Sequence, residues 1–137
     1  MADYRTPSWD GVQSIIDAER ERYLERYAKR TITEHEELSR PSTQFEDDVR
    51  IVYDELMSIL LKKHKDYGPR NIADAPGGPI NGLRVRIHDK VARINNLIDT
   101  GSNQPEYESM EDSFKDLANY AIIALLVMRG KWDSERR

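Results

Sequence analysis

EDSFKDLANYAIIALLVM, residues 111–128, is the stretch that decides the fold. Its second half is apolar on every side, and a helix of this kind normally lies at the centre of a bundle. Its first half nevertheless carries Asp112, Asp116 and Asn119. At about 100° per residue these three side chains fall within one narrow sector of the helix. The stretch therefore predicts a buried helix whose one polar stripe faces other helices.

A buried carboxylate needs a partner, because taking an unpaired charge out of water costs several kcal/mol. The expected helix over residues 83–99 offers basic partners. Lys90 projects from within its apolar face, and Arg86 and Arg93 flank that lysine. Guanidinium groups match phosphate oxygens in geometry, and a lysine adds a mobile point charge. This pattern indicates a site for phosphates between the two helices.

The expected helix over residues 44–66 adds acids. Glu55 lies at the margin of its apolar stripe, and Asp48 lies two turns earlier on the same edge. Acids from separate helices can converge on Mg²⁺, which prefers oxygen ligands and is usually held by few carboxylates plus substrate phosphates. Carboxylates, cations and the glycine-rich loop at residues 68–82 together point to a phosphate ester or phosphoanhydride, with Mg²⁺ as cofactor.

The class of fold is expected to be all-α, because no stretch alternates apolar and polar residues as a strand would. A first, highly charged helix is expected to begin at Ser8 or Asp10 and to reach about Arg30. Thr43 and Glu46 have the spacing of a capping box at the start of the next helix. We predict a charged N-terminal helix and linker at 1–43, a helical domain that carries the candidate site at 44–131 and a C-terminal tail at 132–137.

Composition narrows the function classes. With 137 residues the chain suits one ordinary domain, and its net charge of −4 argues against a general nucleic-acid binder. The absence of cysteine excludes disulfides and thiolate chemistry. The first residues lack a signal-peptide pattern, and the longest apolar run, residues 121–128, is far short of a membrane span. We expect a cytoplasmic protein that forms a homodimer or higher homo-oligomer, because helices so apolar exceed what one four-helix unit can cover.

Plainer interpretations exist for the same residues. The acids and amide of the last helix could pair with Lys90 and Arg93 as a structural network. Glu55 could be an ordinary charge at the edge of a surface. His64 and His88 fall off the apolar faces and are expected to be solvated.

Three blocks in this order carry a family resemblance: KHKDYGPRNI at residues 63–72, GLRVRIHDKVARINNLI at residues 82–98 and EDSFKDLANYAIIALL at residues 111–126. The chain resembles the nucleotide modification associated domain of the first type, a family common in phages and bacteria. The similarity covers Phe45 to Met128. It implies an all-α fold and a nucleotide ligand.

More distantly, the chain resembles the MazG-like all-α nucleoside triphosphate pyrophosphohydrolases, which are four-helix units that usually dimerise and hold Mg²⁺ with E-x-x-E and E-x-x-D pairs. Asp116-Leu-Ala-Asn119 stands where E-x-x-D would be, so Asn119 offers a neutral carbonyl in place of a carboxylate. No E-x-x-E occurs on the helix of Glu55. Asp89 and Asp112 would make up the number of ligands.

The resemblance also places the Lys65-Asp66-Tyr67-Gly68 element near the ligand. Tyr67 could stack on a base, or it could simply anchor the end of a helix, and Asn71 could read a base. The expected catalytic residues are Asp116, Glu55 and Lys90, the metal ligands are Glu55, Asp89, Asp112 and Asp116, and the substrate-binding residues are Arg86, Arg93, Lys65, Tyr67, Asn71 and Asn119.

Three hypotheses follow. The first is a Mg²⁺-dependent enzyme of phage or bacterial nucleotide metabolism that cleaves a (deoxy)nucleoside triphosphate to the monophosphate and pyrophosphate. The second is a non-catalytic module that binds or sequesters a nucleotide, which would be stabilised by nucleotides without turnover. The third is a structural or partner-binding helical protein, which would show no nucleotide effect.

Overall fold

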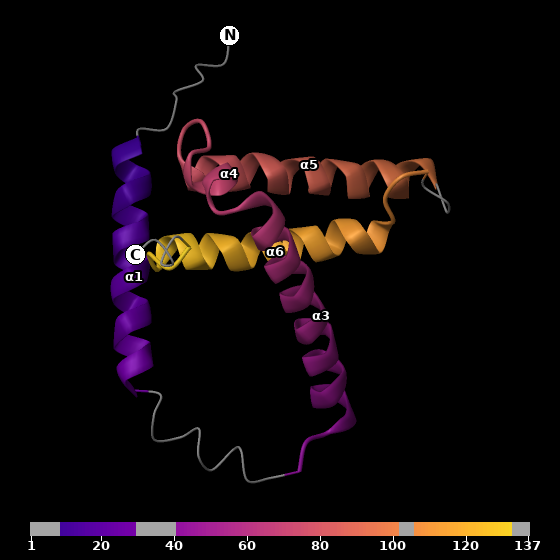
Figure 1. The fold of residues 1–137 in the computed structure, drawn as a ribbon, viewed down its shortest axis with the longest axis horizontal. Coiled ribbons are helices and arrows are strands. Elements are labelled where there is room, and N and C mark those ends of the chain that lie inside the picture. Colours follow the sequence, from indigo (N-terminus) through magenta and orange to yellow (C-terminus); the bar gives the residue numbers. More distant parts are fainter. Residues whose placement is uncertain (1–8, 30–40, 102–105, 133–137) are drawn as a thin grey trace. The chain divides into compact units, whose positions relative to one another are not determined.

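The computed structural model describes residues 9–29, 41–101 and 106–132 (Figure 1). The chain divides into two compact units, residues 1–41 and 42–137. The first unit contains α1 (Trp9–Lys29), a helix of 21 residues that confirms the expected N-terminal helix. Pairs one turn apart support its surface, including the ion pair Arg22–Glu19 and the hydrogen bond from Gln13 to Asp17.

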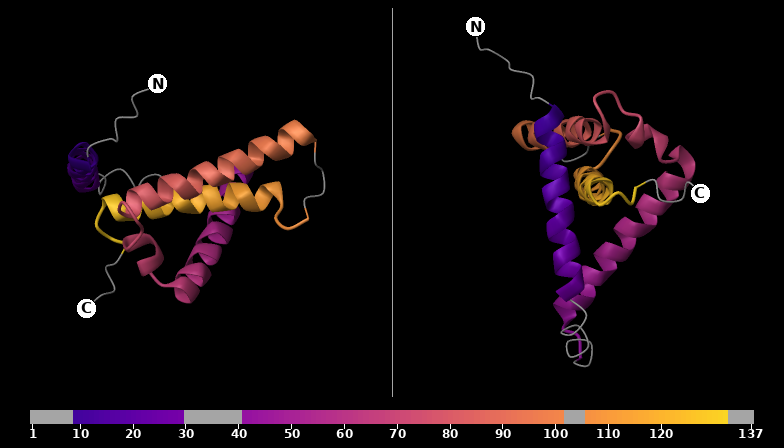
Figure 2. Two further views of the ribbon diagram at one scale, coloured as in Figure 1. Left: turned by 90° about the horizontal axis from the view of Figure 1, so that it is seen from above. Right: turned by 90° about the vertical axis from the view of Figure 1, so that its left-hand side faces the viewer.

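The second unit is built from α3 (Gln44–Tyr67), α4 (Arg70–Ala73), α5 (Pro79–Thr100) and α6 (Met110–Met128). Figures 1 and 2 show α5 and α6 side by side and antiparallel, with the second half of α3 crossing α6. The part of the chain described here contains no strand, so the predicted all-α class is confirmed. The MazG-like four-helix arrangement stays a prediction.

Side-chain caps set where α3 and α6 begin. The capping box predicted for α3 is present: Thr43 Oγ1 accepts from the Glu46 amide at 3.2 Å, and Glu46 Oε2 accepts from the Thr43 amide at 2.7 Å. A second capping box opens α6. There Ser109 Oγ accepts from the Asp112 amide at 3.0 Å, and Asp112 Oδ2 accepts from the Ser109 amide at 3.1 Å. Both boxes satisfy helix donors that would otherwise lack a partner.

The third expected helix begins earlier than predicted. We placed its start at Leu83, whereas α5 starts at Pro79, directly after Gly78. Proline is favourable at the first position of a helix, where its missing N–H is not needed. The loop before it also contains the short helix α4. Gly82 packs closely in the first turn of α5, since a Cβ there would lie 2.6 Å from Ala75 Cβ.

The core of this unit forms where α4 packs against α5 and α6. Ile72, Leu83 and Ile123 are its buried members, and Leu60, Ile80, Tyr120, Ala124, Val127 and Trp132 pack around them. Trp132, which we assigned to the C-terminal tail, donates from Nε1 to the Pro69 carbonyl at 3.0 Å. Its ring also meets the edge of His64 at 4.9 Å between centroids. The expectation that His64 is solvated is therefore wrong, whereas His88 is exposed.

Candidate functional site

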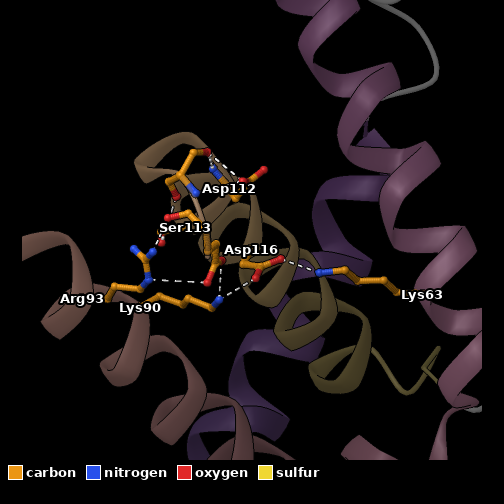
Figure 3. A network of polar contacts seen from close by, with 8 residues as sticks. Lys63, Lys90, Arg93, Asp112, Ser113 and Asp116 are labelled. Atoms are coloured by element: carbon orange, nitrogen blue, oxygen red, sulfur yellow. Dashed lines mark hydrogen bonds and ion pairs between the residues drawn. The ribbon is translucent and has the colours of Figure 1, made fainter. Parts of the chain in front are cut away.

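Asp116 of α6 lies between two lysines from different helices (Figure 3). Its Oδ1 lies 2.7 Å from Lys63 Nζ of α3, and its Oδ2 lies 2.8 Å from Lys90 Nζ of α5. The side chains of Asp116 and Lys90 are only 15% and 18% exposed, whereas that of Lys63 is 51% exposed. The predicted approach of Lys90 to the polar stripe of α6 is thus present.

Glu108 provides a second acid that the sequence analysis missed. Its Oε1 lies 2.6 Å from Lys90 Nζ, and its Oε2 lies 3.6 Å from Arg93 Nε. Arg93 Nη2 also donates to the Glu108 backbone carbonyl. Glu108 directly precedes the N-cap of α6, outside the helix. A helical projection therefore could not place it, although its position beside the start of α6 was a signal.

The charges of this network reinforce one another. Burial by itself raises the pKa of Asp116, but hydrogen bonds from Lys63 and Lys90 outweigh it and hold that pKa below its ordinary value. Burial likewise lowers the pKa of Lys90, yet its bonds to Asp116 and Glu108 raise the pKa above the ordinary value. Both groups are therefore charged near neutral pH.

The other predicted metal ligands have separate surroundings. Asp112 is exposed and caps α6, and hydrogen bonds from the Ser109 side chain and backbone lower its pKa. Glu55 is exposed and pairs with Lys115 Nζ at 2.5 Å, while Asp89 is exposed on α5. Across the described residues, no cluster of three or more His, Cys, Asp or Glu side chains could hold a metal ion. The four expected ligands are therefore not gathered into one cluster within the described part of the chain.

A cavity of about 390 Å³ opens beside the Asp116 network, between the second half of α3, α4 and the facing sides of α5 and α6. Five of the predicted site residues line it: Tyr67, Asn71, Arg86, Asp116 and Asn119. The other lining residues are Leu60, Lys63, His64, Gly68, Ile72, Tyr120 and Ile123. The structure thus gathers residues that are far apart in the sequence around one space.

Several polar atoms at this cavity are buried without a partner among the residues that the structure describes. They are both amide atoms of Asn119, Nη1 of Arg86 and Nδ1 of His64. Arg86 Nη2 does donate to the Asn71 carbonyl at 3.3 Å. Buried polar groups nearly always have hydrogen bonds, and a buried group without one is costly. The cavity wall is therefore equipped for a polar ligand.

Not every predicted binding residue faces this cavity. Lys65 is exposed in the last turn of α3, where a cation favours the helix dipole. Lys90 and Arg93 do not line the cavity. Lys90 contacts Asp116, which does line it, and Arg93 contacts Glu108. Lys63, by contrast, was missed. It continues the row of Leu56 and Leu60 at helical spacing, and a lysine in an apolar row was a usable signal.

Residues 63–128 match the family model described as nucleotide modification associated domain 1. This segment belongs to that family. The resemblance predicted from the three sequence blocks is confirmed, over a range that starts at Lys63 and not at Phe45. Every residue lining the cavity except Leu60 lies within the nucleotide modification associated domain. No curated protein and no solved structure matches the chain.

Where the structure describes the chain, it contains no helix with the length and apolarity to span a membrane.

Proposed function

We propose that the cavity lined by Lys63, Arg86 and Asn119 binds a nucleotide. The observation that carries this proposal is the set of buried polar atoms without a partner, which belong to residues lining one cavity within the nucleotide modification associated domain. A purely structural network would leave fewer such groups unsatisfied. The proposal is that of a binding module, the second of the hypotheses from the sequence.

The charge of the site favours an anionic ligand. Lys63, Lys90, Arg86 and Arg93 bring four positive charges, and Asp116 and Glu108 bring two negative charges. This local excess of positive charge occurs in a chain whose net charge is −4. Phosphate groups supply the complementary charge, and arginine forks match their oxygens in geometry. We assign the phosphate end of the ligand to Lys63, which lines the cavity directly, and Arg86 Nη1 is a further donor to the ligand within the cavity.

The size and walls of the cavity suit a ligand of this class. Small-molecule sites usually occupy about 300–1,000 Å³, and this cavity of about 390 Å³ falls in that range. Its wall combines aliphatic side chains with a few polar groups. Tyr67 is exposed at the end of α3 and lines the cavity, so its ring can pack against a bound nucleotide.

Mg²⁺-dependent pyrophosphohydrolase activity on (deoxy)nucleoside triphosphates is the second candidate function. Asp116 favours it, because its ionised carboxylate lines the same cavity. Lysines hold both oxygens of this carboxylate, however, so a Mg²⁺ ion would have to compete with Lys63 or Lys90. Glu55, Asp89 and Asp112 do not join it in a metal cluster of the described residues. Binding without turnover is therefore our first proposal.

The test is isothermal titration calorimetry of the full chain with nucleoside mono- and triphosphates, with and without Mg²⁺. An assay for pyrophosphate release accompanies it. We expect binding that needs no Mg²⁺ and no release of pyrophosphate. Arg86→Ala should weaken binding at least about tenfold, as expected for a lost charged hydrogen bond. Arg84→Ala is the matched control, because Arg84 is exposed on the same helix. Release of pyrophosphate that depends on Mg²⁺ and Asp116 would instead support the enzyme.

We further propose that a second copy of the chain covers an apolar groove formed by α3 and α6, making the protein a homodimer or higher homo-oligomer. The groove has a volume of about 610 Å³ and is lined by Phe45, Asp48, Val49, Val52, Tyr53, Leu56, Ala118, Ala121, Ile122 and Leu125. Four of these lining side chains, Phe45, Val52, Tyr53 and Leu125, are between 48% and 75% exposed, and neighbouring exposed apolar side chains mark surfaces that partners cover. A nucleotide ligand also accords with the cytoplasmic location that we expect.

A further inference from the structure

We infer that Asn119 reads the hydrogen-bonding edge of the base, so that the nucleotide enters the cavity base first. This inference rests on the proposed nucleotide binding and adds the orientation and the recognition element. The phosphates would then remain near Lys63, at the exposed side of the cavity. The alternative orientation puts phosphates against Asn119 and leaves the base outside.

The different burial of Asn119 and Lys63 indicates how the nucleotide is oriented in the cavity. Asn119 is 5% exposed, whereas the Lys63 side chain is 51% exposed, and both line the same cavity. A phosphate is a strongly hydrated anion and is costly to bury beside a neutral amide. A base has an apolar face and polar edges, so it suits a deep position between Ile72 and Ile123, which also line the cavity.

The chemistry of the amide indicates what it recognises. Both Oδ1 and Nδ2 of Asn119 are buried without a partner among the described residues, so one acceptor and two donors remain unused. A cation or a phosphate would use only one kind of atom. A base edge offers a donor next to an acceptor, and an asparagine can bind such an edge with both atoms. The complementary ligand is therefore a nucleoside phosphate, not a bare sugar phosphate.

Two substitutions of Asn119 separate base reading from structure. Asn119→Leu keeps the approximate shape and removes both polar atoms. Because the amide has no partner in the described chain, its loss should leave the melting temperature equal or higher. Asn119→Asp keeps the shape but offers acceptors only. Among the bases, guanine alone presents two adjacent donors, so this variant should favour guanine.

The experiment is titration of the full chain and both variants with AMP, CMP, GMP, UMP and ribose 5-phosphate. For the wild type, we expect at least one nucleotide to bind about tenfold more tightly than the nucleotide with the least favoured base, the discrimination of one good pair of hydrogen bonds. In Asn119→Leu that preference should vanish, while the affinity for ribose 5-phosphate stays within about twofold. In Asn119→Asp the preference should move to GMP.

The results that overturn the inference differ from those that overturn the proposed function. Suppose that nucleotides bind the wild type, and that Asn119→Leu lowers the affinity for ribose 5-phosphate as much as the affinity for nucleotides. Asn119 then does not read the base, and the proposed nucleotide binding stands. Base reading is likewise excluded if ribose 5-phosphate binds the wild type as tightly as every nucleotide. If Asn119→Leu fails to fold, the test rests on Asn119→Asp. An equal loss of affinity for all four nucleotides in that variant overturns the inference. If the wild type binds none of the nucleotides, both proposals fail.

Discussion

Lys90 and Asp116 face each other from α5 and α6, with 2.8 Å between Nζ and Oδ2, in surroundings that leave each side chain less than one-fifth exposed. Lys90 Nζ also lies 2.6 Å from Glu108 Oε1. One ammonium therefore links the middle of α6 to the residue before its N-cap. This arrangement makes Lys90 a part of the packing of α5 on α6, whatever the cavity binds.

Replacing Lys90 by methionine should destabilise the protein. The change leaves Glu108 with a weaker partner and Asp116 with Lys63 alone. We expect a loss of about 1–3 kcal/mol in the free energy of unfolding, the usual effect of removing a partly buried charged hydrogen bond. Urea unfolding measures it.

The matched control is Lys62→Met, because Lys62 is exposed on α3. It should change the free energy of unfolding by less than about 0.5 kcal/mol. A Lys90→Met variant as stable as the wild type would mean that the network contributes little to the fold and that the lysine is held for a ligand.

Stability should fall in acid through Asp116. The folded protein holds the pKa of this carboxyl below 3.8, its ordinary value, so the unfolded chain binds more protons in that range. The contribution of Asp116 is therefore present above the ordinary pKa and disappears as the pH falls through the folded pKa. Urea unfolding at a series of pH values from about 7 to about 2 measures the slope.

Asp116→Asn is the comparison that assigns this acid dependence. Its free energy of unfolding should be lower near neutral pH and should fall less steeply in acid. Lys90 works in the opposite direction: since its pKa is raised above 10.5, its contribution is lost only as strongly alkaline pH passes the folded pKa. Parallel acid profiles for the wild type and Asp116→Asn would contradict the prediction.

The helical pattern predicted the direction of side chains well and their place along the helix poorly. Asn119 and Ile123 are buried on α6, as the projection indicated, because they face residues of α3, α4 and α5 around the cavity. The prediction that α6 is buried on every side is wrong, since Phe114 and Leu125 are 53% and 48% exposed. Asp112 falls on the same side of the projection but lies at the third position of α6. There the nearest unsatisfied groups are those of the helix end, so its carboxylate binds Ser109.

Residues outside helices escaped the sequence analysis for a physical reason. Glu108 has no helical phase, so no projection could bring it to Lys90 and Arg93. The start of α5 was also mispredicted. The glycine-rich composition before Leu83 predicted a loop, but proline is stabilising at the first position of a helix, and α5 begins at Pro79. The three family blocks, by contrast, are recognised from the identity of successive residues. All three lie within residues 63–128, which match the family model.

Removing the capping carboxylate of α6 should cost stability without affecting the cavity. Asp112→Ala takes away the acceptor for the Ser109 amide and hydroxyl. We expect a lower free energy of unfolding, as for the loss of other helix caps. Nucleotide affinity measured without Mg²⁺ should be unchanged.

Ser109→Ala should have a similar effect on unfolding, because it removes the other half of the same capping box. Asp112 would regain its predicted place as a metal ligand if Asp112→Ala abolished a Mg²⁺-dependent effect that Ser109→Ala left intact.

A charge placed in the apolar groove should separate the subunits. Val52 is 53% exposed and lines the groove between α3 and α6. If a second copy covers this groove, Val52→Asp would bury an unpaired carboxylate at the contact, which costs several kcal/mol. We expect light scattering after size-exclusion chromatography to give a dimer or larger for the wild type and a monomer for Val52→Asp.

Ile51→Asp is the matched control for Val52→Asp. Ile51 is an exposed aliphatic residue of the same helix turn, but it does not line the groove. A variant charged at this position should therefore keep the mass of the wild type. If both variants dissociate, the contact lies on a wider face of α3 than the groove. If the wild type is a monomer at high concentration, a second copy is not what covers these apolar side chains, and the oligomer proposal is wrong.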